Sequence, residues 1–262
     1  MSTNSFGTKY GPWALVAGAS EGLGAAFATE LAKRNLNLIL IARRFEKLEV
    51  LSAELMNTYQ IEVKYHSADL ADYSQLRQFI LELNLDIGLL VYNAAYAPIG
   101  YFESISEESL DRIVNVNIKT PLLLSKFMSH KMIDKKKGGI ILMSSLAGAQ
   151  GSPKIATYAA SKAFNAILAE GIWHELRRQG IDVLASCAGA ISTPGYKNAQ
   201  NSKDAMGTLD AEKVAEKTLN QLGKGPTTIP GRVNKIAHFL MTRVFSRKQA
   251  ISIMHDNTKH LT

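Results

Sequence analysis

Short apolar runs alternate with longer helical patterns along most of this 262-residue chain. Several of these runs hold no polar side chain, which indicates strands that are covered on both faces. The apolar runs are residues 13–17, 38–41, 61–65, 87–91, 140–143 and 181–184. The helical patterns lie near residues 22–34, 44–58, 72–84, 106–134 and 157–179. A repeated strand–helix order predicts right-handed crossovers between parallel strands, and therefore an α/β fold with a doubly wound parallel sheet.

The chain shows no linker and no internal repeat, so we predict a single domain over residues 1–262. Breakers at Pro226 and Gly231 bracket what we expect to be a last short strand. Residues 194–208 are polar and rich in glycine and proline, which predicts a mobile loop over a binding site.

Composition narrows the class of protein. A content of 46% hydrophobic and 20% charged residues is typical of a soluble globular protein. The net charge of +7 is dispersed rather than gathered into an arginine-rich stripe, so we expect no nucleic-acid partner. The single cysteine, Cys187, fits a reducing compartment and is interpreted as a small buried hydrophobe. With no secretory leader and no apolar run of membrane-spanning length, the expected location is cytoplasmic.

A glycine cluster follows the first expected strand directly. It reads Gly18-Ala19-Ser20-Glu21-Gly22-Leu23-Gly24 and runs into small, helix-forming residues. Glycines let the backbone turn tightly, and a helix N-terminus offers free N–H groups and a positive dipole end to phosphate. By itself the cluster is also explained by a tight strand–helix turn. Its position between strand and helix favours a dinucleotide site.

A second motif joins Ser145, Tyr158 and Lys162. Tyr158 and Lys162 are four residues apart and share one helix face, and Ser145 precedes Tyr158 by thirteen residues. A nearby cation favours the phenolate, so we expect Lys162 to lower the pKa of Tyr158. A serine hydroxyl from another segment would then hold a carbonyl oxygen beside that acid. A chance pair, with a half-buried tyrosine and a solvated lysine, is the alternative.

The glycine spacing, the Ser145–Tyr158–Lys162 arrangement and the chain length together resemble the short-chain dehydrogenase/reductase family, from about residue 12 to residue 194. The resemblance implies a Rossmann fold, a nicotinamide cofactor, no metal ion, and transfer of hydride between that cofactor and a carbonyl group. It also implies a set of cofactor-binding residues: Gly18, Ser20, Glu21, Gly22, Leu23, Gly24, Arg43, Arg44, Asp69, Leu70, Asn93, Ala94, Ala95, Tyr158, Lys162, Ile191 and Thr193.

Within that set, the resemblance places Asp69 against the adenine, and Ile191 and Thr193 near the nicotinamide amide and the phosphates. It adds Asn117 to the catalytic group, where it would hold a water that connects Lys162 with solvent. Structural alternatives exist for two of these residues. Asp69 could cap a helix, and Asn117 could satisfy buried backbone at a helix irregularity.

The end of the second expected strand, Ala42-Arg43-Arg44, bears on the choice of nucleotide. An acidic side chain at this place would bind the ribose 2′-hydroxyl of NAD, and it would repel the 2′-phosphate of NADP. Small Ala42 and basic Arg43 therefore favour NADP(H) over NAD(H), because the guanidinium fork suits a phosphate. Glu21 complicates this, since relatives that prefer NADP often have a basic residue there.

Two short segments depart from the family pattern. Tyr92 and Ala95 stand where relatives usually carry Asn and Gly, and Ala188 replaces the usual proline before Gly189. The Ala95 methyl group and the loss of a fixed proline φ leave the cofactor geometry open at both places.

The sequence thus predicts an enzyme that reduces a ketone or aldehyde reversibly with NADPH, Tyr158 giving the proton. The alternative is a non-catalytic NADP(H)-binding regulatory protein of the same fold, from which one of the three motif residues would be expected to be missing. Tyr96, Ala149 and Tyr196 are candidate substrate neighbours. Relatives are often homodimers or homotetramers formed through the helices that follow Ser106 and Tyr158.

The C-terminal extension, residues 232–262, has apolar residues at helical spacing with basic residues between them. We expect its apolar face to dock on the domain, on a substrate lid or on a second subunit, because most amphipathic helices bury that face in protein. Contact with a membrane surface is the less favoured alternative. The extension resembles that of ketoacyl and steroid ketone reductases, which implies an apolar or acyl substrate.

Overall fold

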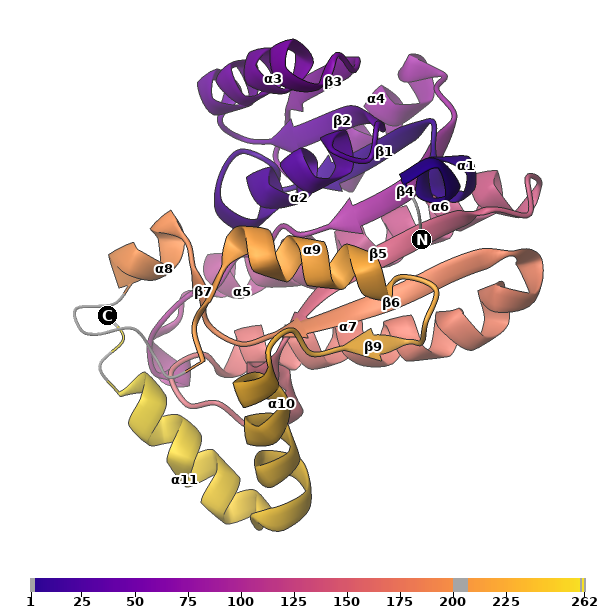
Figure 1. Ribbon diagram of the computed structural model, residues 1–262. Helices are drawn as coiled ribbons and strands as arrows, with labels where there is room; N and C mark the ends of the chain where they lie inside the picture. Colours follow the sequence, from indigo (N-terminus) through magenta and orange to yellow (C-terminus); the bar gives the residue numbers. More distant parts are fainter. Residues whose placement is uncertain (1–2, 200–206, 260, 262) are drawn as a thin grey trace.

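A seven-stranded parallel sheet forms the centre of the molecule (Figure 1). The computed structural model describes residues 3–199, 207–259 and 261. Strand order is β3-β2-β1-β4-β5-β6-β9, and every neighbouring pair is parallel. The strands are β1 (Trp13–Ala17), β2 (Asn37–Ala42), β3 (Val63–Ser67), β4 (Ile87–Tyr92), β5 (Gly138–Ser145), β6 (Ile181–Ala188) and β9 (Thr227–Thr228). The order reverses between β1 and β4, so the crevice at their carboxyl ends is where such a sheet binds ligands.

Helices cover both faces of the sheet and enclose two hydrophobic cores. One core joins the sheet to α1 (Thr3–Tyr10), α2 (Gly22–Ala32), α3 (Phe45–Tyr59) and α9 (Ala211–Gln221). The other core joins it to α4 (Tyr73–Leu83), α6 (Thr120–Ile133) and α7 (Ala156–Leu176). Strand β1 shows the alternation, since Ala14 and Val16 enter the first core while Leu15 and Ala17 enter the second.

The helical pattern expected over residues 106–134 is confirmed as a helix without a break over residues 107–133, but this helix is not uniform. The structure has α5 (Glu107–Val114), a π-helical turn (Asn115–Lys119) and then α6. Pro121 lies in the first turn of α6 and has no backbone N–H, so it cannot donate the α-helical bond to the carbonyl of residue 117. The ladder widens at that point into a π-helix. Asn117 therefore lies at a helix irregularity.

Several elements were not predicted. Helix α1 is fastened to the sheet by a hydrogen bond of 2.5 Å from the Tyr10 hydroxyl to Asp182. A small two-stranded sheet joins β7 (Ile191–Ser192) to β8 (Leu209–Asp210), and short 3₁₀ turns cover Phe102–Ser104, Leu146–Ala149 and Arg177–Gln179.

The expected loop over residues 194–208 begins as helix α8 (Pro194–Ala199), because the Thr193 hydroxyl accepts a bond from the Tyr196 N–H and starts the first turn. Residues 200–206 of that expected loop lie outside the described residues.

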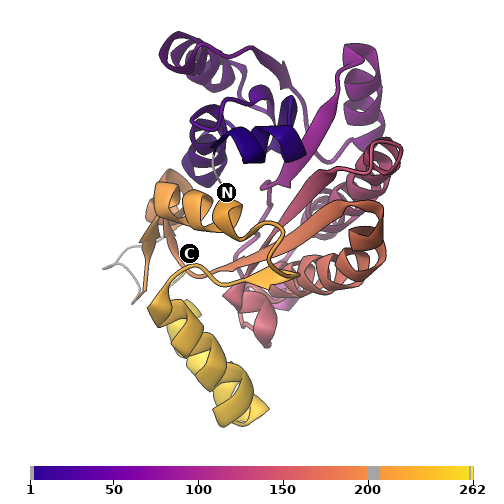
Figure 2. The same ribbon diagram turned by 45° about the vertical axis from the view of Figure 1, so that its right-hand side comes forward.

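Residues 232–258, here called the C-terminal arm, project from the sheet at the β9 side (Figures 1 and 2). The arm consists of α10 (Arg232–Phe239), a π-helical turn (Leu240–Val244) and α11 (Arg247–Thr258). A capping box of Ser246 and Gln249 starts α11. The Arg247 guanidinium donates to the Ala149 carbonyl at 2.7 Å, which ties the arm to the segment that follows β5. Among the described residues, no helix is long and apolar enough to cross a membrane.

Candidate active site

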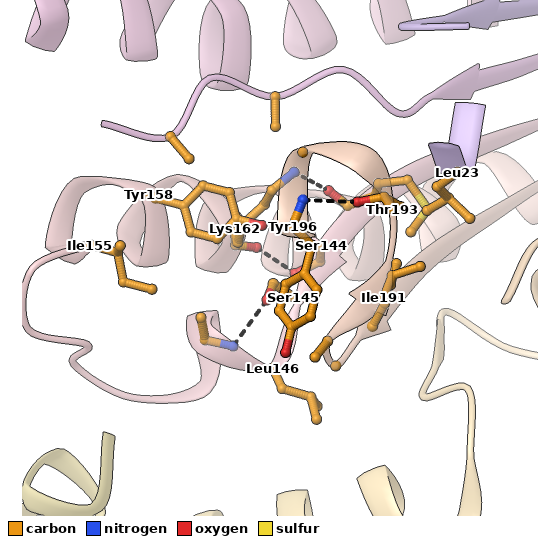
Figure 3. Close-up of a pocket in the computed structure, with 18 of the residues that line it drawn as sticks. Leu23, Ser144, Ser145, Leu146, Ile155, Tyr158, Lys162, Ile191, Thr193 and Tyr196 are labelled. Carbon is orange, nitrogen blue, oxygen red and sulfur yellow. Dashed lines mark hydrogen bonds between the residues drawn. The ribbon is translucent and has the colours of Figure 1, made fainter. Parts of the chain in front are cut away.

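A pocket of about 1000 Å³ opens at the carboxyl ends of the central strands. It brings together nearly all of the residues singled out from the sequence. These are Gly18, Ser20, Glu21, Gly22, Leu23, Arg43, Arg44, Asp69, Leu70, Asn93, Ala94, Ala95, Tyr96, Ser145, Tyr158, Lys162, Ile191, Thr193 and Tyr196. Gly24, Asn117 and Ala149 do not line it. Figure 3 shows Ser145, Tyr158 and Lys162 close together, with Leu23, Ile191 and Thr193 across from them.

The loop after β1 needs glycines because neighbouring backbone and side-chain atoms lie very close to it. Gly18 has φ +85°, and a Cβ added there would lie 2.7 Å from the Ala94 backbone. A Cβ on Gly24 would lie 1.9 Å from the Gly18 carbonyl oxygen, so this glycine lets α2 pack directly on the loop. A Cβ on Gly22, at φ +57°, would lie 3.0 Å from Thr193 Cγ2. Any larger residue at these places would fill the narrow space between the loop and its neighbours.

The N-terminus of α2 carries no side-chain cap, because Glu21 at the capping position makes no such bond. Gly22 and Leu23, in the first turn of α2, line the pocket, so the unpaired N–H groups of that turn are available to a phosphate. This end of the pocket therefore fits a dinucleotide.

The segment after β4 holds the glycine loop in place. Asn93 Nδ2 donates to the Gly18 carbonyl at 2.9 Å, and the Asn93 and Ala94 N–H groups donate to Ala17. The unusual Tyr92 is buried and donates its hydroxyl to the Val116 carbonyl at 2.6 Å, which ties β4 to the π-helical turn. Ala95 is exposed, so its methyl group is accommodated without a clash.

A basic corner lies where β2 ends. Arg44 donates to Ser20 Oγ at 3.0 Å and pairs with Glu21 at 2.7 Å, and Lys47 pairs with the other Glu21 oxygen at 2.5 Å. The hydrogen bond from Arg44 is the main cause that lowers the pKa of Glu21. Among the described residues Arg43 has no ion pair, and it lies exposed on the pocket wall. The Glu21 carboxylate thus faces two cations, and the third cation, Arg43, has the Asp69 carboxylate in its neighbourhood.

Asp69 lies beside this corner and accepts bonds from the Ala71 N–H at 3.0 Å and from Arg112 at 2.8 Å. Burial opposes its ionisation, but these two bonds outweigh burial and lower the pKa of the carboxyl group. The helix-cap alternative is wrong, because Asp72 caps α4; Asp69 instead closes the turn before that helix and lies on the pocket wall.

The ends of β5 and α7 set the positions of Ser145 and Tyr158. Ser144 Oγ donates to the Lys162 carbonyl at 2.7 Å, which fixes strand to helix. A Cβ on Gly148 would lie 2.7 Å from the Ala163 nitrogen, so the turn after Ser145 packs directly on α7. Ser145 Oγ accepts a bond from the Ala147 N–H at 3.2 Å and is hydrogen-bonded to the Tyr158 side chain. The serine and the phenol thus lie together on one wall of the pocket.

Lys162 is only 2% exposed. Its Nζ lies 5.5 Å from the centre of the Tyr158 ring and donates to the Met143 carbonyl at 2.9 Å. Burial lowers the pKa of Lys162 to about 8. Burial also raises the pKa of Tyr158, against the smaller lowering by Ser145. The expectation that Lys162 lowers the Tyr158 pKa is therefore wrong for this arrangement, because the ammonium lies over the ring and is bonded to the backbone, where burial of the phenol dominates.

Asn117 is fully buried behind the pocket. Its side chain accepts from the Tyr96 N–H at 2.8 Å and donates to the Tyr96 carbonyl at 2.8 Å and to Ser161 Oγ at 3.0 Å. It thereby connects the segment after β4 with α7. Ala149, outside the lining, instead accepts the bond from Arg247; its neighbours Ala147 and Gln150 face the cavity.

Sequence reasoning missed the part of the pocket that the C-terminal arm builds. Apolar residues of the arm form one wall: Ala237, Leu240, Met241, Phe245, Ile253 and Met254. Two polar atoms in the pocket lining, Gln150 Oε1 and His238 Nδ1, are buried with no partner among the described residues. The helical period of the arm was visible in the sequence, but a period alone does not tell which face points inward.

A doubly wound sheet with a glycine loop at its switch point, and with Ser145, Tyr158 and Lys162 in the same pocket, defines a nicotinamide-dependent oxidoreductase. The comparison with known proteins agrees. The family described as "short chain dehydrogenase" matches residues 12–204, and the chain belongs to this family. It is accordingly an enzyme that acts on carbonyl or CH–OH groups.

Curated relatives of this chain include proteins with two different named activities and a protein that is named inactive. A 7beta-hydroxysteroid dehydrogenase of Clostridium sardiniense is 32% identical, over 88% of this chain and 90% of its own. A very-long-chain 3-oxoacyl-CoA reductase of Anas platyrhynchos is 30% identical, over 96% and 80%. The human inactive hydroxysteroid dehydrogenase-like protein 1 is 37% identical, over 67% of this chain and 54% of its own.

Solved structures agree on the fold. A 7beta-hydroxysteroid dehydrogenase studied for its stereoselectivity superposes with a TM-score of 0.89 at 28% identity, over 95% of this chain and 98% of its own. A short-chain dehydrogenase from Sphingobium yanoikuyae in complex with NADPH gives a TM-score of 0.78 at 26% identity, over 90% and 97%.

Proposed function

We propose that the protein is an NADPH-dependent reductase of a bulky, apolar ketone, reversible in the direction of alcohol oxidation. The observation that carries this proposal is one continuous pocket. It joins the glycine loop, the basic corner, the Ser145–Tyr158–Lys162 group and the apolar wall of the C-terminal arm. Cofactor, proton donor and substrate volume therefore meet in a single cavity.

The basic corner supports NADPH over NADH. Ala42 offers no carboxylate to a ribose, and Arg43, Arg44 and Lys47 outweigh the single charge of Glu21. The complication raised by Glu21 is reduced, because its two oxygens are already occupied by Arg44 and Lys47. A 2′-phosphate would find a net positive surface here. The relative from Sphingobium yanoikuyae, which binds NADPH, is consistent with this choice.

Each residue of the catalytic group has a proposed role. The nicotinamide, when bound, supplies the hydride. Ser145 binds the carbonyl oxygen of the substrate and holds it beside the Tyr158 hydroxyl, which gives up its proton to that oxygen. Burial raises the pKa of Tyr158, so the phenol keeps its proton at neutral pH until the reduced carbonyl oxygen, which is a stronger base, takes it. Lys162, whose Nζ is held by the Met143 carbonyl, contacts the nicotinamide ribose, and Asn117 positions the segment after β4 against α7 through its bonds to Tyr96 and Ser161.

The volume and lining of the pocket support a large, mostly apolar substrate. Ligand pockets hold roughly 300–1,000 Å³, so a cavity of about 1000 Å³ has space for a cofactor portion and a bulky ketone. The arm presents aliphatic, methionine and phenylalanine side chains, and Gln150 and His238 present single polar atoms that would bind polar groups of the substrate. A steroid ketone combines these properties, and a long acyl ketone is the second candidate of the same chemistry.

A non-catalytic NADP(H)-binding protein is the alternative, since one relative is named inactive. The presence of Ser145, Tyr158 and Lys162 in one pocket argues against it. We further propose a homodimer or homotetramer formed through α5, α6 and α7, whose exposed residues include Val114, Leu122 and Ile167.

Oxidation of NADPH followed spectroscopically with a panel of steroid, long-chain and small ketones tests the proposal. We expect turnover with the bulky ketones, and a loss of about 10²-fold or more in kcat for Tyr158→Phe, with the dissociation constant of NADPH nearly unchanged. Binding of NADPH without turnover of any ketone would favour the non-catalytic alternative. A Tyr158→Phe variant as active as the wild type would reject the assigned proton donor.

A further inference from the structure

The C-terminal arm has two apolar faces, and only one of them is used by the pocket. Ala237 and Met241 line the cavity. On the other side of the same helix, Ile236 is 61% exposed, and Phe239 and Val244 are each 58% exposed. The sequence led us to expect a single apolar face docked on protein. Within one chain only the inner side docks in this way, since the outer residues belong to neither hydrophobic core.

Helical geometry explains the division. At about 100° per residue, Ile236 and Phe239 point away from Asn234, Ala237 and Met241, while Val233 lies at the edge between the two sides. The arm also projects from the body of the molecule (Figure 2), and Ile236, Phe239 and Val244 on its outer face are exposed. A contiguous group of large exposed apolar side chains of this kind marks an interaction surface.

The charge of the arm indicates what covers this surface. The arm, residues 232–258, holds five basic residues and one acidic residue, so it carries a net +4 of the +7 of the whole chain. Arg232, Lys235 and Arg243 are exposed and fall on the outer half of the helix, between the apolar residues. Lys248 is exposed at the start of α11.

A second copy of the chain is the poorer partner. An isologous contact places the same surface of each copy against the other, so the basic residues of the two arms would face one another. Like charges brought together in this way oppose association. A negatively charged lipid surface fits both the apolar and the basic residues of the arm. It accepts apolar side chains at the acyl boundary and attracts Lys and Arg through its headgroups.

We propose that the outer face of the C-terminal arm, built from Ile236, Phe239 and Val244 with Arg232, Lys235 and Arg243, binds peripherally to an anionic membrane surface. The inner face of the same arm lines the pocket, so membrane contact places the pocket wall next to the bilayer. If the ketone substrate proposed above is apolar, it would enter from the lipid; this last step alone rests on the proposed function.

Co-sedimentation of the full-length protein with vesicles tests the proposal without any measurement of turnover. We expect binding to phosphatidylcholine vesicles that contain phosphatidylserine, weaker binding to phosphatidylcholine alone, and release by salt. Lys235→Gln and Arg243→Gln should each weaken partitioning about fivefold. The pair Ile236→Ser with Phe239→Ser should reduce it by tenfold or more, since two large apolar side chains leave the acyl boundary.

A matched control replaces exposed apolar residues at the far end of the molecule. Val50→Ser with Met56→Ser, on α3, should leave vesicle binding unchanged. None of the substituted residues lines the pocket, so NADPH binding should persist in every variant and verify folding. Equal binding to both kinds of vesicle, no binding, or no effect of the arm variants would overturn the proposal. So would light scattering that shows a dimer lost in Ile236→Ser with Phe239→Ser, which would assign the surface to a second copy.

Discussion

Lys162 is an ionisable side chain in a buried position, where a charge is unfavourable. It is almost completely buried, and its only hydrogen bond from Nζ among the described residues goes to the Met143 carbonyl. The usual pKa of a lysine is 10.5, and burial lowers that of Lys162 to about 8. At neutral pH the ammonium therefore remains charged at a cost to stability, which is expected for a group retained for chemistry rather than for folding.

We predict that Lys162→Met makes the protein more stable at neutral pH while it abolishes turnover. Below pH 8 the lysine is charged in both the folded and the unfolded state, so the full burial cost of up to about 3 kcal/mol is present. Between pH 8 and 10.5 the unfolded chain binds more protons than the folded one, so wild-type stability rises with pH. The advantage of the variant should therefore shrink across this window.

Urea unfolding of the wild type and Lys162→Met at a series of pH values measures this difference. Lys47→Met, at an exposed ion pair with Glu21, serves as the control and should change stability by less than about 1 kcal/mol. A variant that is less stable than the wild type at pH 7, or whose difference does not depend on pH, contradicts the predicted cost.

At the residue scale, the identity of the site could be predicted from the sequence and its electrostatics could not. The spacing of Ser145, Tyr158 and Lys162 led to residues that line one pocket. The direction of the Tyr158 pKa shift depends on whether burial or the ammonium dominates. That balance depends on the Met143 carbonyl, which accepts the hydrogen bond from Lys162 Nζ. Every residue has a backbone carbonyl, so the sequence does not show which one will bind the lysine.

At the scale of single elements, the turn between β2 and α3 bears on the preference for NADPH or NADH. The turn between β2 and α3 presents Arg43 and Arg44, and the ion pairs of Glu21 fix Arg44 and Lys47 beside the glycine loop. Arg43 has no ion pair in the described part of the chain, so it is the residue best placed to contact a 2′-phosphate.

We predict that Arg43→Gln weakens NADPH binding about tenfold to hundredfold, because a hydrogen bond to a charged group contributes about 1.5–3 kcal/mol. NADH lacks the 2′-phosphate, so its dissociation constant should hardly change. Fluorescence titration with each cofactor measures both values. Arg178→Gln, an exposed arginine far from the pocket, is the control; an equal effect of Arg43→Gln on both cofactors would argue against a phosphate contact.

Elements were predicted well where hydrophobic periodicity decides them. Strands over residues 13–17 and 87–91 match β1 and β4 closely, because both faces of each are buried. The long pattern over residues 106–134 predicted a helix correctly but not its π-helical turn, because the apolar pattern runs unbroken through Pro121 while the α-helical hydrogen-bond ladder does not. The start of α8 failed for a similar reason: Thr193 begins a helix in a stretch that composition alone marks as a loop.

At the scale of the whole molecule, the fold class and the position of the cleft followed from the strand–helix order. The contact between the C-terminal arm and the N-terminal part of the chain could not be predicted from that order. Met241, Ile253 and Met254 of the arm complete a pocket whose opposite wall comes from the first two strands. Such a contact depends on the direction in which α10 leaves β9, and no local pattern encodes that direction.

The arm therefore makes a prediction about substrate size. Met241 and Met254 line the cavity with flexible, apolar side chains, which suit an irregular and bulky substrate. We expect Met241→Ala with Met254→Ala to lower kcat/KM for a steroid ketone about tenfold or more, since a lost methylene in an apolar pocket costs 10-fold or so. The kcat/KM for a small ketone that does not reach the arm should fall little.

Val244→Ala, on the exposed side of the same arm, is the control and should affect neither substrate. Steady-state kinetics with NADPH and both ketones separates the effects, and an equal loss for the small ketone would mean that the arm stabilises the site as a whole and does not select the substrate.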